Sequence, residues 1–126
     1  MNDATEKSED VLIADVGEPP YDRRLTDKIL AAFNHALALG YPEIAERLYV
    51  ALEKAENEGV KKYGERRGIT VLDLAGLWRA FIGARDSYQR ALTDPAATPE
   101  RRAEALAKMR ERWRLWVNFT ESSKKS

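Results

Sequence analysis

Apolar residues recur every three to four positions along most of this chain, which is the spacing of one face of an α-helix. One such stretch runs from Leu25 to Leu39, and a second runs from Pro42 to Asn57. Gly40 suits the left-handed turn that ends many helices, and a proline suits the first position of a helix. The short bend predicts an antiparallel helical pair. The residues predicted to be buried are Leu25, Ile29, Leu30, Phe33, Ala36 and Leu37 in the first helix and Ile44, Ala45, Leu48, Ala51, Leu52 and Ala55 in the second.

Residues 58–68 interrupt this pattern. They contain three glycines and four basic residues, which predicts a loop. Residues 70–73, with the sequence TVLD, then resemble a helix-capping box whose acid is one carbon shorter than usual. The third helix that starts there is expected to end near Leu92.

A fourth helix is predicted after Pro95, with Thr98 as its N-cap and Pro99 at its first position. It is expected to end near Phe119, and residues 121–126 are expected to fray. No stretch alternates as a β-strand does. The sequence therefore predicts an all-α fold of four helices in two antiparallel hairpins, with the third helix in the middle.

The third predicted helix carries a stripe of small residues opposite its apolar arc: Gly76, Ala80, Gly83 and Ser87. Each interior glycine costs a helix roughly 1 kcal/mol relative to alanine, so two on one stripe indicate that another backbone approaches closely. That backbone belongs either to this chain or to a partner helix. In both cases we expect the third helix to be buried on two sides. Its apolar arc holds Val71, Leu74, Ala75, Leu77, Trp78, Phe81, Ile82, Tyr88 and Leu92.

The fourth predicted helix carries an apolar pair that lies off its main apolar stripe. Leu115 and Phe119 are one turn apart beside Trp116, on a face that also holds Lys108 and Arg112. Such a pair is a candidate contact patch for a protein. Fraying of the last turn is the alternative. The stripe expected in the core holds Ala103, Leu106, Met109, Trp113, Trp116 and Val117.

Length and composition indicate one globular domain, which we expect over residues 23–120. Of the 126 residues, 44% are apolar and 33% are charged, which is not typical of a disordered chain. The absence of cysteine excludes disulfides and thiolate chemistry. No apolar run approaches the roughly 20 residues that cross a bilayer. We expect a cytoplasmic protein with no export signal and no membrane association.

Charge is distributed unevenly although the net charge is zero. Residues 1–22 carry seven acids and one lysine, whereas residues 98–126 carry eight bases and four acids. We expect residues 1–22 to form a mobile acidic tail, because its apolar stretch EDVLIADV is too short to fold alone. The tail either stays solvated, masks the basic end of the chain, or offers its apolar stretch to a partner.

The sequence holds no recognisable catalytic or metal-binding motif. His35 is the only histidine and falls on the polar face of the first helix, with no second histidine or cysteine for a zinc site. Glycine-rich phosphate loops, Ser-His-Asp sets and His-Glu-x-x-His are missing. Glu43 and Glu46 lie on a predicted exposed face, which does not tune carboxyls for acid–base work. We expect no catalytic residue, no metal and no cofactor, and therefore not an enzyme.

Basic residues leave nucleic-acid binding as an alternative. Lys61, Lys62, Arg66 and Arg67 of the predicted loop, with Arg112 of the fourth helix, could meet phosphates. Acids interrupt the fourth helix, however, and its bases circle it. The sequence also lacks a short recognition helix after a tight turn.

The second predicted helix carries Ala45, Tyr49 four residues later, and Leu52 where a tetratricopeptide repeat usually has alanine. With Gly40 at the bend, residues 25–56 resemble a helical hairpin of the tetratricopeptide type. The first helix departs from that family. It has isoleucine at position 29 where tryptophan is typical and phenylalanine at position 33 where glycine is usual.

A second copy of the same step occurs at Ala84, Tyr88 and Ala91, without a matching first helix. Such repeats generally need three or more units, and three are absent. The stretch DKILAAFNHALALGYPEIAERLYVALEKAE is also similar to one that recurs in small bacterial helical proteins, which implies a bacterial source and no activity.

These features predict a non-enzymatic protein–protein interaction module, an adaptor or regulator that binds a protein partner or itself through helical faces. The alternative is a nucleic-acid-associated protein that uses the basic fourth helix and residues 58–68. A structural subunit of a larger assembly is a third interpretation. The predicted contact residues are Leu115, Phe119, Trp116, Gly76, Ala80 and Gly83.

Overall fold

The computed structural model describes residues 21–65 and 68–125, with side chains for residues 25–65 and 68–121, and this part of the chain holds four helices and no strand. They are α3 (Tyr21–Ala38), α4 (Pro42–Tyr63), α5 (Val71–Thr93) and α6 (Pro99–Lys125). The predicted all-α class is confirmed. The predictions for residues 1–20, which include EDVLIADV, and for Arg66 and Arg67 lie outside the described residues.

The turn and capping signals of the sequence form as expected. Gly40 adopts the left-handed conformation, with φ 83. The Thr70 hydroxyl accepts a hydrogen bond from the Asp73 N–H at 3.1 Å, and the Asp73 carboxylate accepts one from the Thr70 N–H at 3.0 Å. The hydroxyl of Thr98 accepts from the Arg101 N–H at 3.1 Å. These bonds satisfy N–H groups that the first turns of α5 and α6 cannot pair internally.

Several predicted helix boundaries were wrong. α3 already begins at Tyr21, and α6 continues through Lys125 beyond the predicted end. α4 passes through Gly59 and ends only before Gly64, which has φ 84. A single glycine weakens a helix by roughly 1 kcal/mol but does not end it when the backbone hydrogen bonds continue. The first part of the predicted loop 58–68 is therefore helical.

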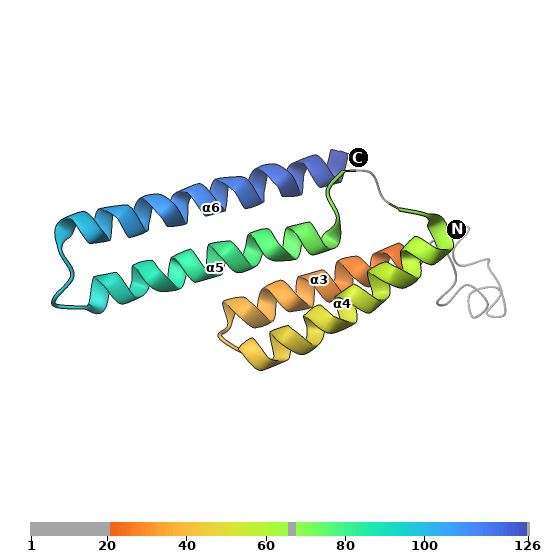
Figure 1. The fold of residues 1–126 in the computed structure, drawn as a ribbon, viewed down its shortest axis with the longest axis horizontal. Helices are drawn as coiled ribbons and strands as arrows, with labels where there is room; N and C mark the ends of the chain where they lie inside the picture. Colours follow the sequence, from red (N-terminus) through yellow and green to blue (C-terminus); the bar gives the residue numbers. More distant parts are fainter. Residues whose placement is uncertain (1–20, 66–67, 126) are drawn as a thin grey trace, which may run out of the picture.

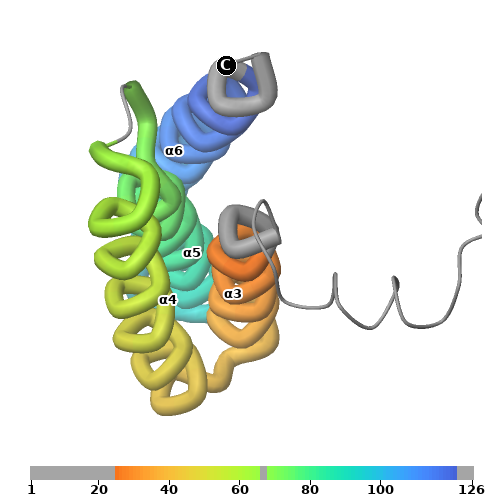
Figure 2. Tube along the Cα trace, turned by 90° about the vertical axis from the view of Figure 1, so that its right-hand side faces the viewer, coloured from red at the N-terminus to blue at the C-terminus, as the bar shows by residue number. Residues whose placement is uncertain are grey.

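α5 lies at the centre of the molecule. Helices α3, α4 and α6 each pack against it, whereas α6 contacts neither α3 nor α4 in the described part of the chain. α3 and α4 lie along each other in opposite directions, and so do α5 and α6 (Figure 1). Figure 2 shows α6 above α5 and apart from α3 and α4.

The three-helix core joins α3, α4 and α5. Phe33 and Leu52 are the largest fully buried side chains, each with 0% exposure. By contrast, no residue of α6 between positions 99 and 121 is fully buried. The members of the three-helix core are Phe33, Ala36, Ala45, Leu52, Val71 and Ala75.

Arg79 of α5 contacts both other helices of this core, α3 and α4. Its guanidinium lies 5.4 Å from the ring centre of Phe33 and 4.8 Å from that of Tyr49. The same group forms an ion pair with the Glu46 carboxylate at 2.7 Å. Cation–π contact and charge pairing thus act together at one side chain.

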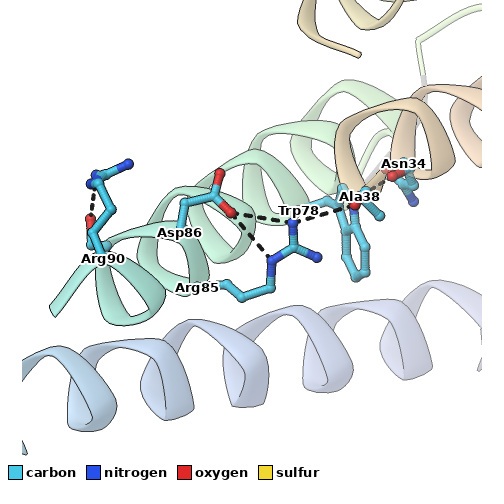
Figure 3. A network of polar contacts seen from close by, with 7 residues as sticks. Asn34, Ala38, Trp78, Arg85, Asp86 and Arg90 are labelled. Carbon is cyan, nitrogen blue, oxygen red and sulfur yellow. Dashed lines mark hydrogen bonds and ion pairs between the residues drawn. The ribbon is translucent and has the colours of Figure 1, made fainter. Parts of the chain in front are cut away.

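Two hydrogen bonds set the register between α3 and α5 (Figure 3). The Trp78 indole N–H donates to the Asn34 carbonyl at 2.8 Å, and the Arg85 guanidinium donates to the Ala38 carbonyl at 3.4 Å. Residue numbers rise together along both helices, so α3 and α5 run in the same direction. α3 ends level with Arg85, and the last two turns of α5 extend beyond the α3–α4 bend (Figure 1).

Four large side chains that were predicted to be buried are exposed. Leu92 is 52% exposed because it lies on the extension of α5, and Leu25 is 53% exposed because the first turn of α3 starts before α5 begins. Ile44, at 53%, lies in the first turn of α4 beside the bend. Trp113, at 45%, belongs to α6, which packs on a single helix of the described chain, α5, and is covered by it only along a narrow strip.

Candidate functional site

Helices α5 and α6 meet through four aromatic rings, which we call the aromatic seam. The ring centres of Trp78 and Trp116 are 4.7 Å apart, and those of Phe81 and Trp113 are 5.2 Å apart. Trp78 also contacts Phe81 at 5.3 Å, and Trp113 contacts Trp116 at 5.6 Å. Such tilted and offset pairs stabilise beyond the area that they bury. Trp116, predicted to be a contact residue, therefore lies half-buried in the seam.

Arg102 closes the far end of the α5–α6 pair. Its guanidinium donates to the carbonyls of Ala91 at 3.0 Å and Asp94 at 3.2 Å. These carbonyls belong to the last turn and cap of α5, where a cation is favourable. This basic residue of α6 thus has a structural role.

The small-residue stripe of α5 is not covered by another helix of the described chain. Gly76 and Gly83 are exposed, and no neighbouring atom lies within 4 Å of the position that a Cβ would take at either residue. Ala80 is half-buried. The expectation that α5 is buried on this side was wrong, because α4 and α6 pack on either flank of the stripe and leave it open.

The apolar pair of α6 lies on the same side as this stripe. Leu115 is half-buried and Phe119 is 39% exposed. At about 100° per residue, Leu115 lies about 160° around α6 from Trp113. Gly83 likewise lies about 160° around α5 from Phe81. Because Phe81 contacts Trp113 and the two helices are antiparallel, Leu115 and Gly83 lie together on the opposite side of the α5–α6 pair. We call Gly76, Ala80, Gly83, Leu115 and Phe119 the open face.

A cleft of about 660 Å³ lies on the other side of the α5–α6 pair. Phe81, Met109 and Trp113 give it an apolar lining, and Arg110 and Arg114 add two guanidinium groups. This cleft was not predicted from the sequence, because Met109 and Trp113 were expected to be core residues. The signal in the sequence is that Arg110 directly follows Met109 and Arg114 directly follows Trp113. Both pairs therefore repeat after four residues, which is about one helical turn.

The two arginines of the cleft have no carboxylate partner in the part of the chain that the structure describes. The Nε of Arg114 donates to the Arg110 carbonyl at 3.3 Å, but neither guanidinium forms an ion pair within residues 25–65 and 68–121. No acid is among the described residues that line the cleft. The cleft is therefore an apolar pocket with an uncompensated positive rim.

The described members of the basic set named for nucleic-acid binding, which are Lys61, Lys62 and Arg112, are not gathered on one surface. Lys61 pairs with Glu58 at 3.4 Å, and the Lys62 ammonium lies 5.9 Å from the centre of the Tyr63 ring at the end of α4. Arg112 is half-buried on α6, which does not contact α4.

Within the described ranges, no group of three or more His, Cys, Asp or Glu residues could hold a metal ion. His35 is exposed on α3, as expected. Over the same ranges, no helix has both the length and the apolar character needed to span a bilayer.

Comparisons with protein-family models, curated proteins and solved structures found no match to this chain. The resemblance of residues 25–56 to a tetratricopeptide-type hairpin stays a prediction. The geometry of the open face and of the cleft is therefore what bears on function.

Proposed function

We propose that this chain is a non-enzymatic protein–protein interaction module that packs a partner helix, from another protein or a second copy, against the open face. The observation that carries this proposal is the exposure of Gly76 and Gly83 inside a helix. Together they weaken α5 by roughly 2 kcal/mol relative to alanine, and no contact in the described chain uses the space that they leave. Small residues allow the backbone of a second helix to approach closely.

Leu115 and Phe119 supply the apolar anchors beside this stripe. Phe119 keeps 39% of its surface exposed on the free chain, and aromatic anchors dominate many binding interfaces. A helix laid along α5 would contact both the glycines and these two side chains. This is the helix-in-groove mode of recognition.

The first test changes the anchors. In the full chain, Leu115→Ser with Phe119→Ser should abolish self-association in sedimentation equilibrium, or retention of a defined protein partner captured from the source organism. Leu92→Ser is the control, because Leu92 is an exposed leucine that lies outside the open face, far along α5. Unchanged association of the double variant, with circular dichroism showing an intact fold, contradicts the proposal.

The second test separates binding from stability. Gly76→Ala with Gly83→Ala should stabilise the free chain, by about 0.5–1 kcal/mol per site, because both positions are helical and open. The same methyl groups should hold a partner backbone away and weaken association. A variant that is more stable and binds as well as the original chain would show that the glycines are not an interface.

Nucleic-acid binding is the less supported proposal, since the described bases are divided between α4 and α6. It predicts binding to generic DNA or RNA that falls steeply as salt rises. Absence of binding at low salt removes it.

A further inference from the structure

The cleft is an apolar feature that the open face does not explain. Trp113 contacts Phe81 beside the cleft yet remains 45% exposed. Among the helices that the structure describes, α5 is the one that packs on α6. An exposed tryptophan beside Met109 gains from any apolar side chain that covers it.

The charges of the cleft restrict what can cover it. Arg110 and Arg114 lie one turn apart at its rim and have no acidic partner among the residues that the structure describes. Guanidinium groups bind carboxylates through paired hydrogen bonds. The fitting occupant is therefore a short apolar peptide flanked by acids.

We propose that residues 9–16 of the same chain, EDVLIADV, bind in this cleft. Their centre, Val11 to Ile13, is apolar, and Glu9, Asp10 and Asp15 flank it. Residues 1–22 carry seven acids and one lysine, a net charge of −6, whereas residues 98–126 carry eight bases and four acids, a net charge of +4. The segment is thus complementary to the cleft in both apolarity and charge. This contact is independent of the open face, which lies on the other side of α5–α6.

The chain is long enough to make this contact within one molecule. The register of α3 and α5 places Phe81 level with about residue 36, and Tyr21 lies about 22 Å from that level at 1.5 Å per residue. From Ile13 to Tyr21 an extended chain spans up to about 26 Å, and from Val11 up to about 33 Å. Both spans exceed the distance along the helix axes, and the remaining length of chain has to cover the sideways distance from α3 to the cleft on α6.

The tether favours this segment over a segment from another copy. The short linker between residues 9–16 and α3 keeps the segment near the cleft at an effective concentration in the millimolar range. This exceeds the concentration at which a second copy of the chain is usually present. A bound segment would cover Trp113 and neutralise both arginines, so acidic peptides from other molecules would have to displace it.

Paramagnetic broadening in NMR spectra tests the contact directly on the full chain. The sequence has no cysteine, so Ser8→Cys gives a single site for a nitroxide label. The label should broaden the Trp113 indole N–H and the Arg110 amide several-fold more than the Gly76 and Gly83 amides on the opposite side. Equal broadening on both sides, or none, overturns the proposal. So does broadening that appears only between a labelled and an isotope-enriched copy.

Charge reversal identifies the groups that hold the segment. Arg110→Glu with Arg114→Glu should abolish the broadening, and changing Glu9, Asp10 and Asp15 to lysine in that variant should restore it. Arg101→Glu with Lys108→Glu is the matched control on the same helix and should change nothing. All four basic side chains are exposed, so circular dichroism is expected to stay unchanged. Persistent broadening after the cleft reversal, or failure of the lysine changes to restore it, contradicts the assignment.

Discussion

The three-helix core and the aromatic seam are built on the same central helix and differ in how many neighbours surround them. In the core, α5 meets both α3 and α4, and Phe33, Leu52 and Ala75 have 0% exposure. In the seam, α5 is the one described helix that α6 packs on, and Trp113 stays 45% exposed. A helix with one partner buries only a narrow strip. We therefore expect the core to contribute more to stability than the seam, whose flanks are exposed.

Trp78 belongs to both regions. Its indole N–H donates to the Asn34 carbonyl of α3 (Figure 3). Its ring packs on the Trp116 ring of α6. Arg85 lies about two turns further along the same face of α5, and its guanidinium donates to the Ala38 carbonyl. The two regions are therefore connected by side chains of α5 rather than by direct contact of α6 with α3.

The largest effect is expected in the core. Phe33→Ala should lower the free energy of unfolding by about 3–5 kcal/mol, because it leaves a cavity and removes the ring contacts with Tyr49 and Arg79. Urea unfolding followed by circular dichroism measures the change. A loss no larger than that of Trp113→Ala would contradict the division into core and seam.

Trp78→Phe should lower the unfolding free energy by about 1–3 kcal/mol, because the Asn34 carbonyl loses its indole donor in a half-buried site. It should also weaken the coupling of the regions. We expect the transition seen by tryptophan fluorescence, which reports the seam, to separate from the transition seen by circular dichroism. Coincident transitions in this variant would show that Trp78 does not connect the two regions.

Trp113→Ala should lower the unfolding free energy by about 1–2 kcal/mol, less than a fully buried aromatic residue, because nearly half of the ring is already in water. Its contacts with Phe81 and Trp116 account for the loss. Urea unfolding is again the measurement. A loss of the size expected for Phe33→Ala would mean that the seam is as important to stability as the core.

Local sequence signals predicted most of the fold. The capping box at Thr70 and the bend at Gly40 depend on a few adjacent residues, and the structure has both. The C-terminal ends of α4 and α6 were predicted too early. Helical hydrogen bonds can continue past a residue of low helix propensity, as they do at Gly59 in α4.

The candidate surfaces were only partly predictable for a different reason. Helical phase identifies Gly76 and Gly83 as one stripe, but it does not say whether a neighbouring helix covers them. Helical phase likewise places Met109 and Trp113 on an apolar stripe without showing whether a helix covers it. They were expected to be covered, but both line the open cleft. Burial depends on the offset between hairpins, which is set by contacts such as Trp78 with Asn34 that join residues far apart in sequence.

The smallest effect on the free energy of unfolding is expected at the ion pair between Arg79 and Glu46, which lies at the protein surface beside the three-helix core. Both side chains are largely exposed, at 45% and 65%, and exposed pairs contribute about 0.2–1 kcal/mol. Glu46→Gln should lower the unfolding free energy by about 0.5 kcal/mol at low salt, and the difference should vanish near 1 M salt, where charges are screened. Glu53→Gln, an exposed acid on the same helix, is the matched control and should show no salt-dependent difference. A salt-independent loss at Glu46 would mean that its carboxylate positions Arg79 over the Phe33 and Tyr49 rings, so that this surface pair is part of the core's own packing.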